Sequence, residues 1–416
     1  MSLCAFGTVP PGALSTPAPF KLSVPAAQQD KLTKLVSEAE IAVPSYYNTH
    51  ADTTNTSSFG LSRDWLVDAQ EAWTSGEYSW RAEQQRLNRF PHFRINITTT
   101  TTAPNDDEDD NAEDGTESET FDLHFAALFS RSASATPVVL MHGWPGSWIE
   151  FGAVLDLLAA RYTAETLPYH VVVPSLPDYG LSTRRGELRR PLTMEGAAGA
   201  IDGLMAALGF GAGYVAQGGD VGAIVGQVLC AKFEACKALH RECVRLLVLL
   251  TPPFMSANAT AAVAGIPVTP AEQAQLARSA IWGSKGTAYV SEHGTRPSTI
   301  ALALSTNPLA MLSWMGEKFI EWSDNRFPLS LNTILSLTSF YWFTNSFGRG
   351  LWAYSFETSR IPVPFSSTKP FGYSAYPLEV TAFPKAWAEH LYPNLVLYRT
   401  HDKVSQESSG CREETP

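Results

Sequence analysis

Cysteine is scarce in this chain of 416 residues. There are five cysteines, an odd number, and no two of them have the C-x-x-C spacing of a zinc or redox site. A small fold held together by disulfides is therefore excluded, and we expect reduced or buried thiols, as in a non-oxidising compartment. The five are Cys4, Cys230, Cys236, Cys243 and Cys411.

Long apolar runs are also missing. No stretch of about 18 apolar residues is uninterrupted, as a membrane-spanning helix would require. The first twenty residues lack the basic start and the apolar run of a secretory signal peptide. We therefore expect a soluble, cytoplasmic protein without a membrane anchor.

The chain has no excess of positive charge. Its net charge is −11, and nine carboxylates lie within residues 106–119, where there is no Lys or Arg. The remainder is nearly neutral, which gives no electrostatic reason to expect nucleic acid or an anionic membrane as a partner. Residues 98–120 are so polar and so negatively charged that we expect an acidic disordered insertion there.

The pattern after this insertion predicts an α/β fold. Short apolar runs alternate with helix-length amphipathic segments from residue 121 to residue 250, which is typical of a mainly parallel sheet flanked by helices. A helical, aromatic-rich block follows, and then two more strand candidates, so we interpret this block as a lid inserted into a catalytic core. The strands are expected at 121–129, 137–141, 169–174, 213–217, 244–250, 370–376 and 394–400. The predicted divisions are an N-terminal segment at 1–97, the insertion at 98–120, the first part of the core at 121–255, the lid at 256–360 and the second part of the core, with a divergent tail, at 361–416.

The segment GGDVG, between a strand candidate and a helix candidate, has the form of a nucleophile elbow with aspartate at its centre. Small neighbours allow the strand and the helix to approach closely, and the helix N-terminus favours an ionised carboxylate that can attack carbon. Taken alone, the pentapeptide also fits a glycine-rich turn with an aspartate helix cap. Its residues are Gly218, Gly219, Asp220, Val221 and Gly222.

The segment HGWPG follows another strand candidate, 78 residues before the aspartate. This turn can aim the backbone N–H of Trp144 at the same point as the N–H of Val221, which would form an oxyanion hole for a tetrahedral intermediate. The turn consists of His142, Gly143, Trp144, Pro145 and Gly146.

Together these motifs resemble the microsomal-type epoxide hydrolases of the α/β-hydrolase fold, in their soluble fungal form. The similarity covers about residues 20–402 and includes DWLVDAQEAWTSGEYSW, which looks like the family's N-terminal segment that wraps the core and reaches the lid. The resemblance implies that a small apolar epoxide and water give a vicinal diol through an ester on Asp220, without a cofactor or a metal. It also implies that Tyr289 and Tyr354 bind the oxirane oxygen and that Glu379 is the charge-relay acid.

The pattern breaks where the family places its base histidine. The expected position holds Gln406, and a neutral amide cannot accept a proton at physiological pH. His401 is a weak substitute because it lies five positions earlier, and the remaining histidines are interpreted as structural. Because Lys403-Val404-Ser405 can be encoded by a splice-donor sequence, we hypothesise that the tail is a retained intron.

Two other functions stay open. A haloalkane dehalogenase shares the aspartate nucleophile, although Val221 stands where that family has a halide-binding tryptophan. A hydrolase-fold protein that captures ligands without turnover fits the missing base directly. The sequence does not indicate which epoxide is the substrate. It is compatible with a homodimer.

Overall fold

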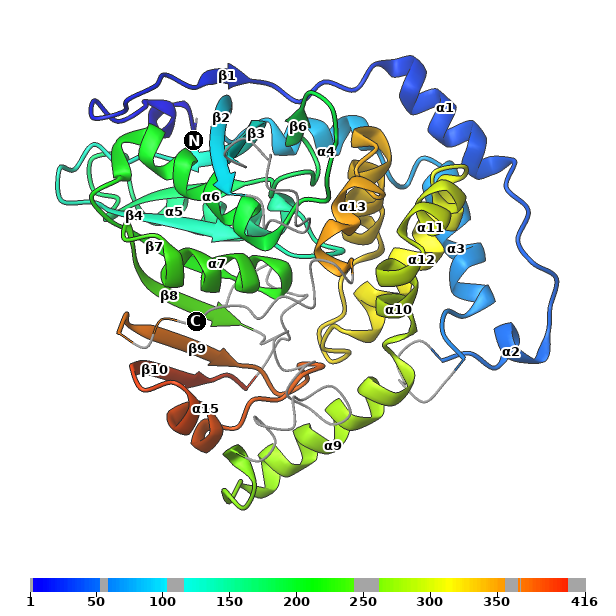
Figure 1. Cartoon of the computed structure of the whole chain (residues 1–416). Coiled ribbons are helices and arrows are strands. Elements are labelled where there is room, and N and C mark those ends of the chain that lie inside the picture. The colour runs from blue at the N-terminus through cyan, green and yellow to red at the C-terminus, as the bar shows by residue number, and fades with distance from the viewer. Residues whose placement is uncertain are drawn as a thin grey trace, which may run out of the picture.

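A computed structural model of the chain describes residues 3–52, 59–102, 116–242, 262–355, 366 and 368–402. Within them, ten strands form one mixed sheet with the order β1-β2-β3-β5-β4-β7-β8-β9-β10, and β6 pairs with β3 (Figure 1). The strands are β1 (Ala18–Phe20), β2 (His92–Thr102), β3 (Thr116–Leu128), β4 (Thr136–Met141), β5 (Tyr169–Pro174), β6 (Thr183–Arg185), β7 (Tyr214–Gly218), β8 (Cys236–Glu242), β9 (Phe371–Ala375) and β10 (Leu395–Thr400).

The six strands from β5 to β10 along this order are parallel, and the strands on the β1 side are antiparallel. Buried parallel strands read as continuous apolar runs, and β5, with the sequence YHVVVP, is buried in all but its first residue. The predicted α/β class is confirmed. The helices are α1 (Ala26–Ser37), α2 (Tyr46–Thr49), α3 (Arg63–Thr74), α4 (Trp80–Leu87), α5 (Gly152–Arg161), α6 (Met194–Met205), α7 (Asp220–Lys232), α9 (Pro270–Lys285), α10 (Ala288–Thr295), α11 (Pro297–Leu304), α12 (Pro308–Glu321), α13 (Leu331–Thr344) and α15 (Lys385–Leu391), with short turns of helix at η1 (Leu3–Gly7), η2 (Trp148–Phe151), η3 (Ala206–Phe210) and η5 (Arg349–Tyr354).

The helices α9 to α13 and η5 lie between β8 and β9 in the chain and gather beside the sheet, on the right of Figure 1. The N-terminal segment is bound to them. The Tyr78 hydroxyl, just before α4, donates a 3.2 Å hydrogen bond to Ser339 on α13, and the ring of Trp80 packs 4.9 Å from that of Phe343. These contacts tie the start of the chain to the helical block.

The acidic segment is more ordered at its flanks than the sequence indicates. The antiparallel ladder of β2 and β3 continues from Thr98↔Thr120 to Thr102↔Thr116, so the prediction of disorder was wrong for these ten residues. Threonine is β-branched and favours extended backbone, and the hydroxyls of Thr98 and Thr120 lie 2.9 Å apart across the strands. Residues 103–115 lie outside the described part of the chain.

The sequence did not indicate the strand that directly follows α7. The strand that pairs with β7 and β9 is β8, whose alternating burial fits a half-buried strand, whereas the expected strand at 244–250 lies outside the described residues. The other domain boundaries stay a prediction.

A disulfide joins Cys230, near the end of α7, to Cys236, at the start of β8. Both residues are buried, but the expectation of reduced thiols was wrong for this pair, because the short connection brings the two Cα atoms to 5.0 Å, within the range that a disulfide spans. Cys4 is exposed. No helix in the described ranges is both long enough and apolar enough to cross a membrane.

Candidate active site

The two motif turns lie side by side at one edge of the sheet. β4 and β7 are parallel neighbours with Met141 opposite Gly218, so the turns that leave their carboxyl ends face each other. The backbone N–H of Trp144 donates a 2.9 Å hydrogen bond to Oδ1 of Asp220. The structure therefore brings the predicted nucleophile and one predicted oxyanion donor into direct contact.

The glycines of both motifs are needed for this approach. A Cβ atom on Gly222 would overlap the carbonyl oxygens of Met141 and His142, and one on Gly143 would overlap the side chain of Asp220. Asp220 itself has a φ of 44°, in the left-handed region that non-glycine residues rarely adopt. Such backbone strain is typical of a nucleophile held at a strand-to-helix turn.

His142 fixes the first turn. Its Nε2 accepts a 3.0 Å hydrogen bond from the N–H of Leu176, so Nδ1 carries the proton and donates to the carbonyl of Gly143 at 2.9 Å. Burial lowers the pKa of His142 to about 4, which keeps the ring neutral. The turn is also held from the lid, since the hydroxyl of Tyr341 on α13 donates a 2.7 Å hydrogen bond to the carbonyl of Gly146.

Both predicted lid tyrosines pack against Trp144. Tyr289 on α10 stacks on its indole with the ring centroids 5.3 Å apart, and Tyr354, the last residue of η5, meets it edge-on at 5.6 Å. The two phenol rings lie 5.7 Å from each other, and both are buried. Residues 65 positions apart in the chain thus converge on the turn that binds Asp220.

The two residues predicted to take part in the charge relay or to replace its base lie close to β9. Glu379 is buried after β9, where its Oε1 accepts a 2.9 Å hydrogen bond from the N–H of Val380. His401 follows β10, with its Nε2 3.2 Å from the hydroxyl of Ser374 and its ring stacked on Tyr376. The contacts found for both residues are with neighbours of β9. Gln406 and the hypothesised intron-derived tail lie outside the described residues.

The remaining motif residues complete the two turns. Pro145 follows Trp144 through a cis peptide bond, and Val221 is fully buried in the first turn of α7. Gly219 is the residue before that helix, and its N–H lies 3.3 Å from the carbonyl of Met141. The oxyanion role of Val221 stays a prediction.

Sequence reasoning missed three residues near the site. His293, four positions after Tyr289 on α10, is fully buried, and its ring lies 4.7 Å from that of Trp144 and 4.9 Å from that of Tyr354. Its Nε2 accepts a 3.0 Å hydrogen bond from the indole N–H of Trp314. Helical spacing alone would have placed His293 on the face of Tyr289.

The other two missed residues are carboxylic acids. Glu150 in η2 and Glu242 at the end of β8 line a small cavity together with Asp220. Burial and the nearby charges of Asp220 and Glu242 raise the pKa of Glu150 to about 8, and burial raises that of Glu242 to about 7. A glutamate within the apolar run SWIEFGAV was the available signal for Glu150, and no local signal marked Glu242.

Comparisons with known proteins identify the family of the chain. The family described as the epoxide hydrolase N terminus matches residues 17–151, and the alpha/beta hydrolase fold matches residues 136–269. A candidate epoxide hydrolase of Dothistroma septosporum is 36% identical over 398 residues, which cover 95% of this chain and 87% of that protein. The chain belongs to the epoxide hydrolase family.

Solved structures support the same assignment. The epoxide hydrolase of Aspergillus niger is 37% identical with a TM-score of 0.80, and the match covers 97% of this chain and 95% of that chain. The juvenile hormone epoxide hydrolase of the silkworm Bombyx mori has a TM-score of 0.70 at 21% identity, over 95% and 90% of the two chains, which shows the fold alone. This member of the family is a hydrolase with the α/β-hydrolase fold, as its motifs predicted.

Proposed function

We propose that this hydrolase converts a small apolar epoxide and water into a vicinal diol through an alkyl ester on Asp220. The observation that carries the proposal is the 2.9 Å hydrogen bond from the Trp144 N–H to Asp220, beneath two buried tyrosines that pack on the Trp144 ring. A carboxylate beside an oxyanion donor, with two phenols packed on the residue that carries this donor, has the groups that ring opening requires.

In the first half-reaction Asp220 attacks an oxirane carbon. The C–O bond breaks and its electrons pass to the oxygen, which takes a proton from Tyr289 or Tyr354. Phenols suit this step because their usual pKa of about 10 lets them bind the oxirane oxygen and protonate the developing alkoxide. The N–H groups of Trp144 and Val221 would then stabilise the tetrahedral intermediate when water attacks the ester. No cofactor is required.

The intact mass of the purified protein after incubation with styrene oxide, with diol assayed in the same tube, tests the proposal. We expect either a covalent adduct equal to the epoxide or diol formation, and Asp220→Asn should abolish both. Tyr289→Phe and Tyr354→Phe should each slow ring opening by about 10²-fold. Tyr46→Phe, which alters an exposed tyrosine on α2, serves as the matched control. Adduct or diol at the wild-type rate in Asp220→Asn would refute the assignment.

The second candidate function is ligand capture without turnover, which Gln406 favours. Capture would give a stable adduct and no diol, whereas turnover would give diol with only a transient adduct.

A further inference from the structure

The acidic residues near Asp220 line a small cavity. The described residues that line it include Glu150, Gln217, Asp220 and Glu242, and about 20 Å³ of it is open to the centre of a water molecule. A cavity needs roughly 10–15 Å³ by this measure to hold one water. The cavity beside the nucleophile is therefore large enough for about one water molecule.

Glu150 is turned toward this cavity by its local structure. Its carboxylate folds back over the oxyanion turn so closely that a Cβ atom on Gly146 would overlap both of its oxygens. The backbone N–H of Ser147 donates a hydrogen bond to the carboxylate. Glu242 is held differently, because the Nε2 of Gln217 donates a 2.7 Å hydrogen bond to its Oε1.

The same side chain also reaches a second cavity. Glu150 lines a space of about 340 Å³ between α4, α5 and α13, together with Glu83 and Arg86. Arg86 is paired there with Glu83 at 2.7 Å. Glu150 thus forms part of the wall of both cavities, and the larger one offers a route for proton exchange with Glu150 besides the small cavity at Asp220.

We infer that Glu150 is the base that activates the water which hydrolyses the Asp220 ester. This inference rests on the proposed function. The water oxygen bonds to Cγ of Asp220 while Glu150 takes one water proton. The tetrahedral intermediate then collapses, the bond from Cγ to the substrate oxygen breaks, and the leaving alkoxide takes the proton from Glu150. The second water proton passes from the new Asp220 carboxyl group to the tyrosinate left by ring opening, which restores the Asp220 carboxylate with one oxygen from water, and the diol departs.

The charge on Asp220 changes during the reaction, and this changes the pKa of Glu150. The groups that face Glu150 are Asp220, Glu242, the neutral His142 and the ion pair of Arg86 with Glu83. Burial, and to a smaller extent the negative charge of Asp220, raises the pKa of Glu150 to about 8, so the acid holds its proton before the epoxide reacts. Esterification removes that charge, which lowers the pKa of Glu150 toward the working pH, where a general base is most effective.

Single-turnover kinetics with styrene oxide, followed by the mass of quenched protein, separate ester formation from ester decay. We expect Glu150→Gln to form the ester at a near-normal rate and to hydrolyse it about 10²–10⁴-fold more slowly. Glu242→Gln removes a neighbouring charge and should shift the pH profile of ester decay to lower pH. Asp156→Asn, which removes an exposed carboxylate on α5 that pairs with Arg89, should leave both steps unchanged.

Wild-type ester decay in Glu150→Gln, or an equal slowing of formation and decay, would overturn the role of Glu150 alone. The absence of both adduct and diol in the wild-type protein would overturn the proposed function and this inference with it. Infrared spectroscopy gives a readout that does not need turnover. The band of a protonated carboxyl group that is present in the wild type and absent in Glu150→Gln belongs to Glu150. This band should titrate at a lower pH in Asp220→Asn than in the wild type, because the neighbouring negative charge is removed. An unchanged titration in that variant would also count against the inference.

Discussion

Individual glycines control how closely the nucleophile turn approaches the oxyanion turn. Gly222 belongs to α7, yet its Cα faces the carbonyl oxygens at the end of β4, and no side chain fits between them. Gly226, one helical turn later, faces mainly side-chain atoms, of which Cδ1 of Leu239 would lie 2.7 Å from an added Cβ. The first contact is with rigid backbone and the second is with the end of a flexible side chain.

Gly222→Ala should therefore destabilise the protein by about 3 kcal/mol or more and abolish ester formation, since strand and helix must separate to admit the methyl group. Gly226→Ala, the matched control, should change the free energy of unfolding by less than about 1.5 kcal/mol, because the Leu239 side chain can move and alanine favours the helix. Urea denaturation of both variants measures the difference. Similar losses in the two variants would contradict the prediction.

Among the elements, α9 is joined to α15, in the second part of the core, by the carboxylate of Glu272, and Ser279 and Gln275 of α9 make further hydrogen bonds to that part. Oε2 of Glu272 accepts hydrogen bonds from the N–H and the hydroxyl of Thr269 at the start of α9, both at 2.8 Å. Its Oε1 accepts a 2.8 Å hydrogen bond from the N–H of Lys385 at the start of α15. A single side chain thus caps a lid helix and holds it to a core helix.

Glu272→Ala should cost about 1–2 kcal/mol of stability and increase amide hydrogen exchange in the first turn of α9, because it removes both the cap and the link. Glu389→Ala breaks an exposed pair with Lys385, whose charged atoms lie 3.6 Å apart, and should cost less than about 0.5 kcal/mol. Hydrogen exchange followed by mass spectrometry distinguishes the two variants. Protection of α9 in Glu272→Ala equal to that of the wild type would show that its other contacts hold the helix.

The sequence was informative where chemistry is local and uninformative where distant segments meet. The glycines flanking Asp220 identified the elbow because a tight turn imposes its residue types directly. Glu150 was missed because its importance depends on the neighbouring strand ends that carry Asp220 and Glu242, which no local pattern reveals. The disulfide of Cys230 was missed for the same reason, since it depends on how α7 turns into β8.

For the whole molecule, buried groups of two kinds make stability depend on pH in opposite directions. Burial lowers the pKa values of His92 and His142 from 6.5 to about 4, so the folded state resists protonation and loses stability as the pH falls below 6.5. The pKa values of Glu150 and Glu242 are raised from 4.5 to about 8 and about 7, so the folded state keeps protons that the unfolded chain releases. This second contribution is lost as the pH rises above 4.5.

We therefore expect the free energy of unfolding to peak between about pH 4.5 and 6.5 and to fall as the pH rises from 6.5 to 8. Glu242→Gln should remove about 0.8 kcal/mol of that fall, since one pKa unit corresponds to about 1.4 kcal/mol and a carboxyl group with a pKa of about 7 loses most of its proton within this range. Glu71→Gln, which alters an exposed residue on α3, should not change the decrease in the free energy of unfolding between pH 6.5 and 8. Urea denaturation at a series of pH values measures the curve, and a constant stability from pH 6.5 to 8 would refute the assigned titrations.

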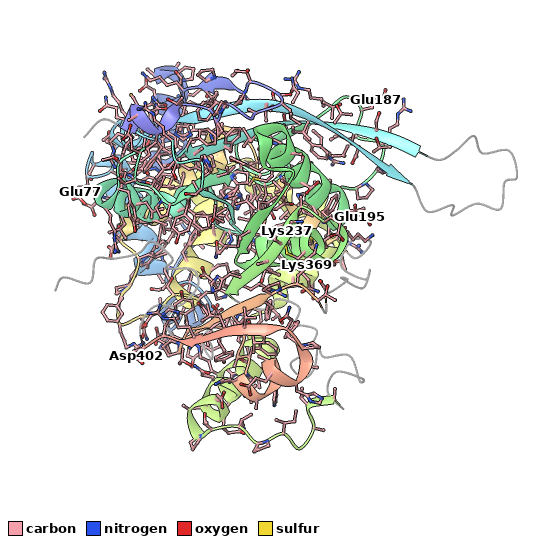
Figure 2. The ribbon with its side chains drawn as sticks, turned by 90° about the vertical axis from the view of Figure 1, so that its left-hand side faces the viewer. Glu77, Glu187, Glu195, Lys237, Lys369 and Asp402 are labelled. Atoms are coloured by element: carbon pink, nitrogen blue, oxygen red, sulfur yellow. A yellow bond between two sulfur atoms is a disulfide. The ribbon has the colours of Figure 1, made fainter. Side chains whose placement is uncertain are left out.

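The long hairpin of β2 and β3 has a practical consequence for work on this enzyme. Its ladder continues to Thr102↔Thr116, and Figure 2 shows these strands projecting beyond the body of the molecule. A label or a small domain inserted between the two strand ends would be carried by paired backbone and would stand clear of the cavity beside Asp220. This hairpin is therefore a rational attachment point for immobilising the hydrolase on a solid support.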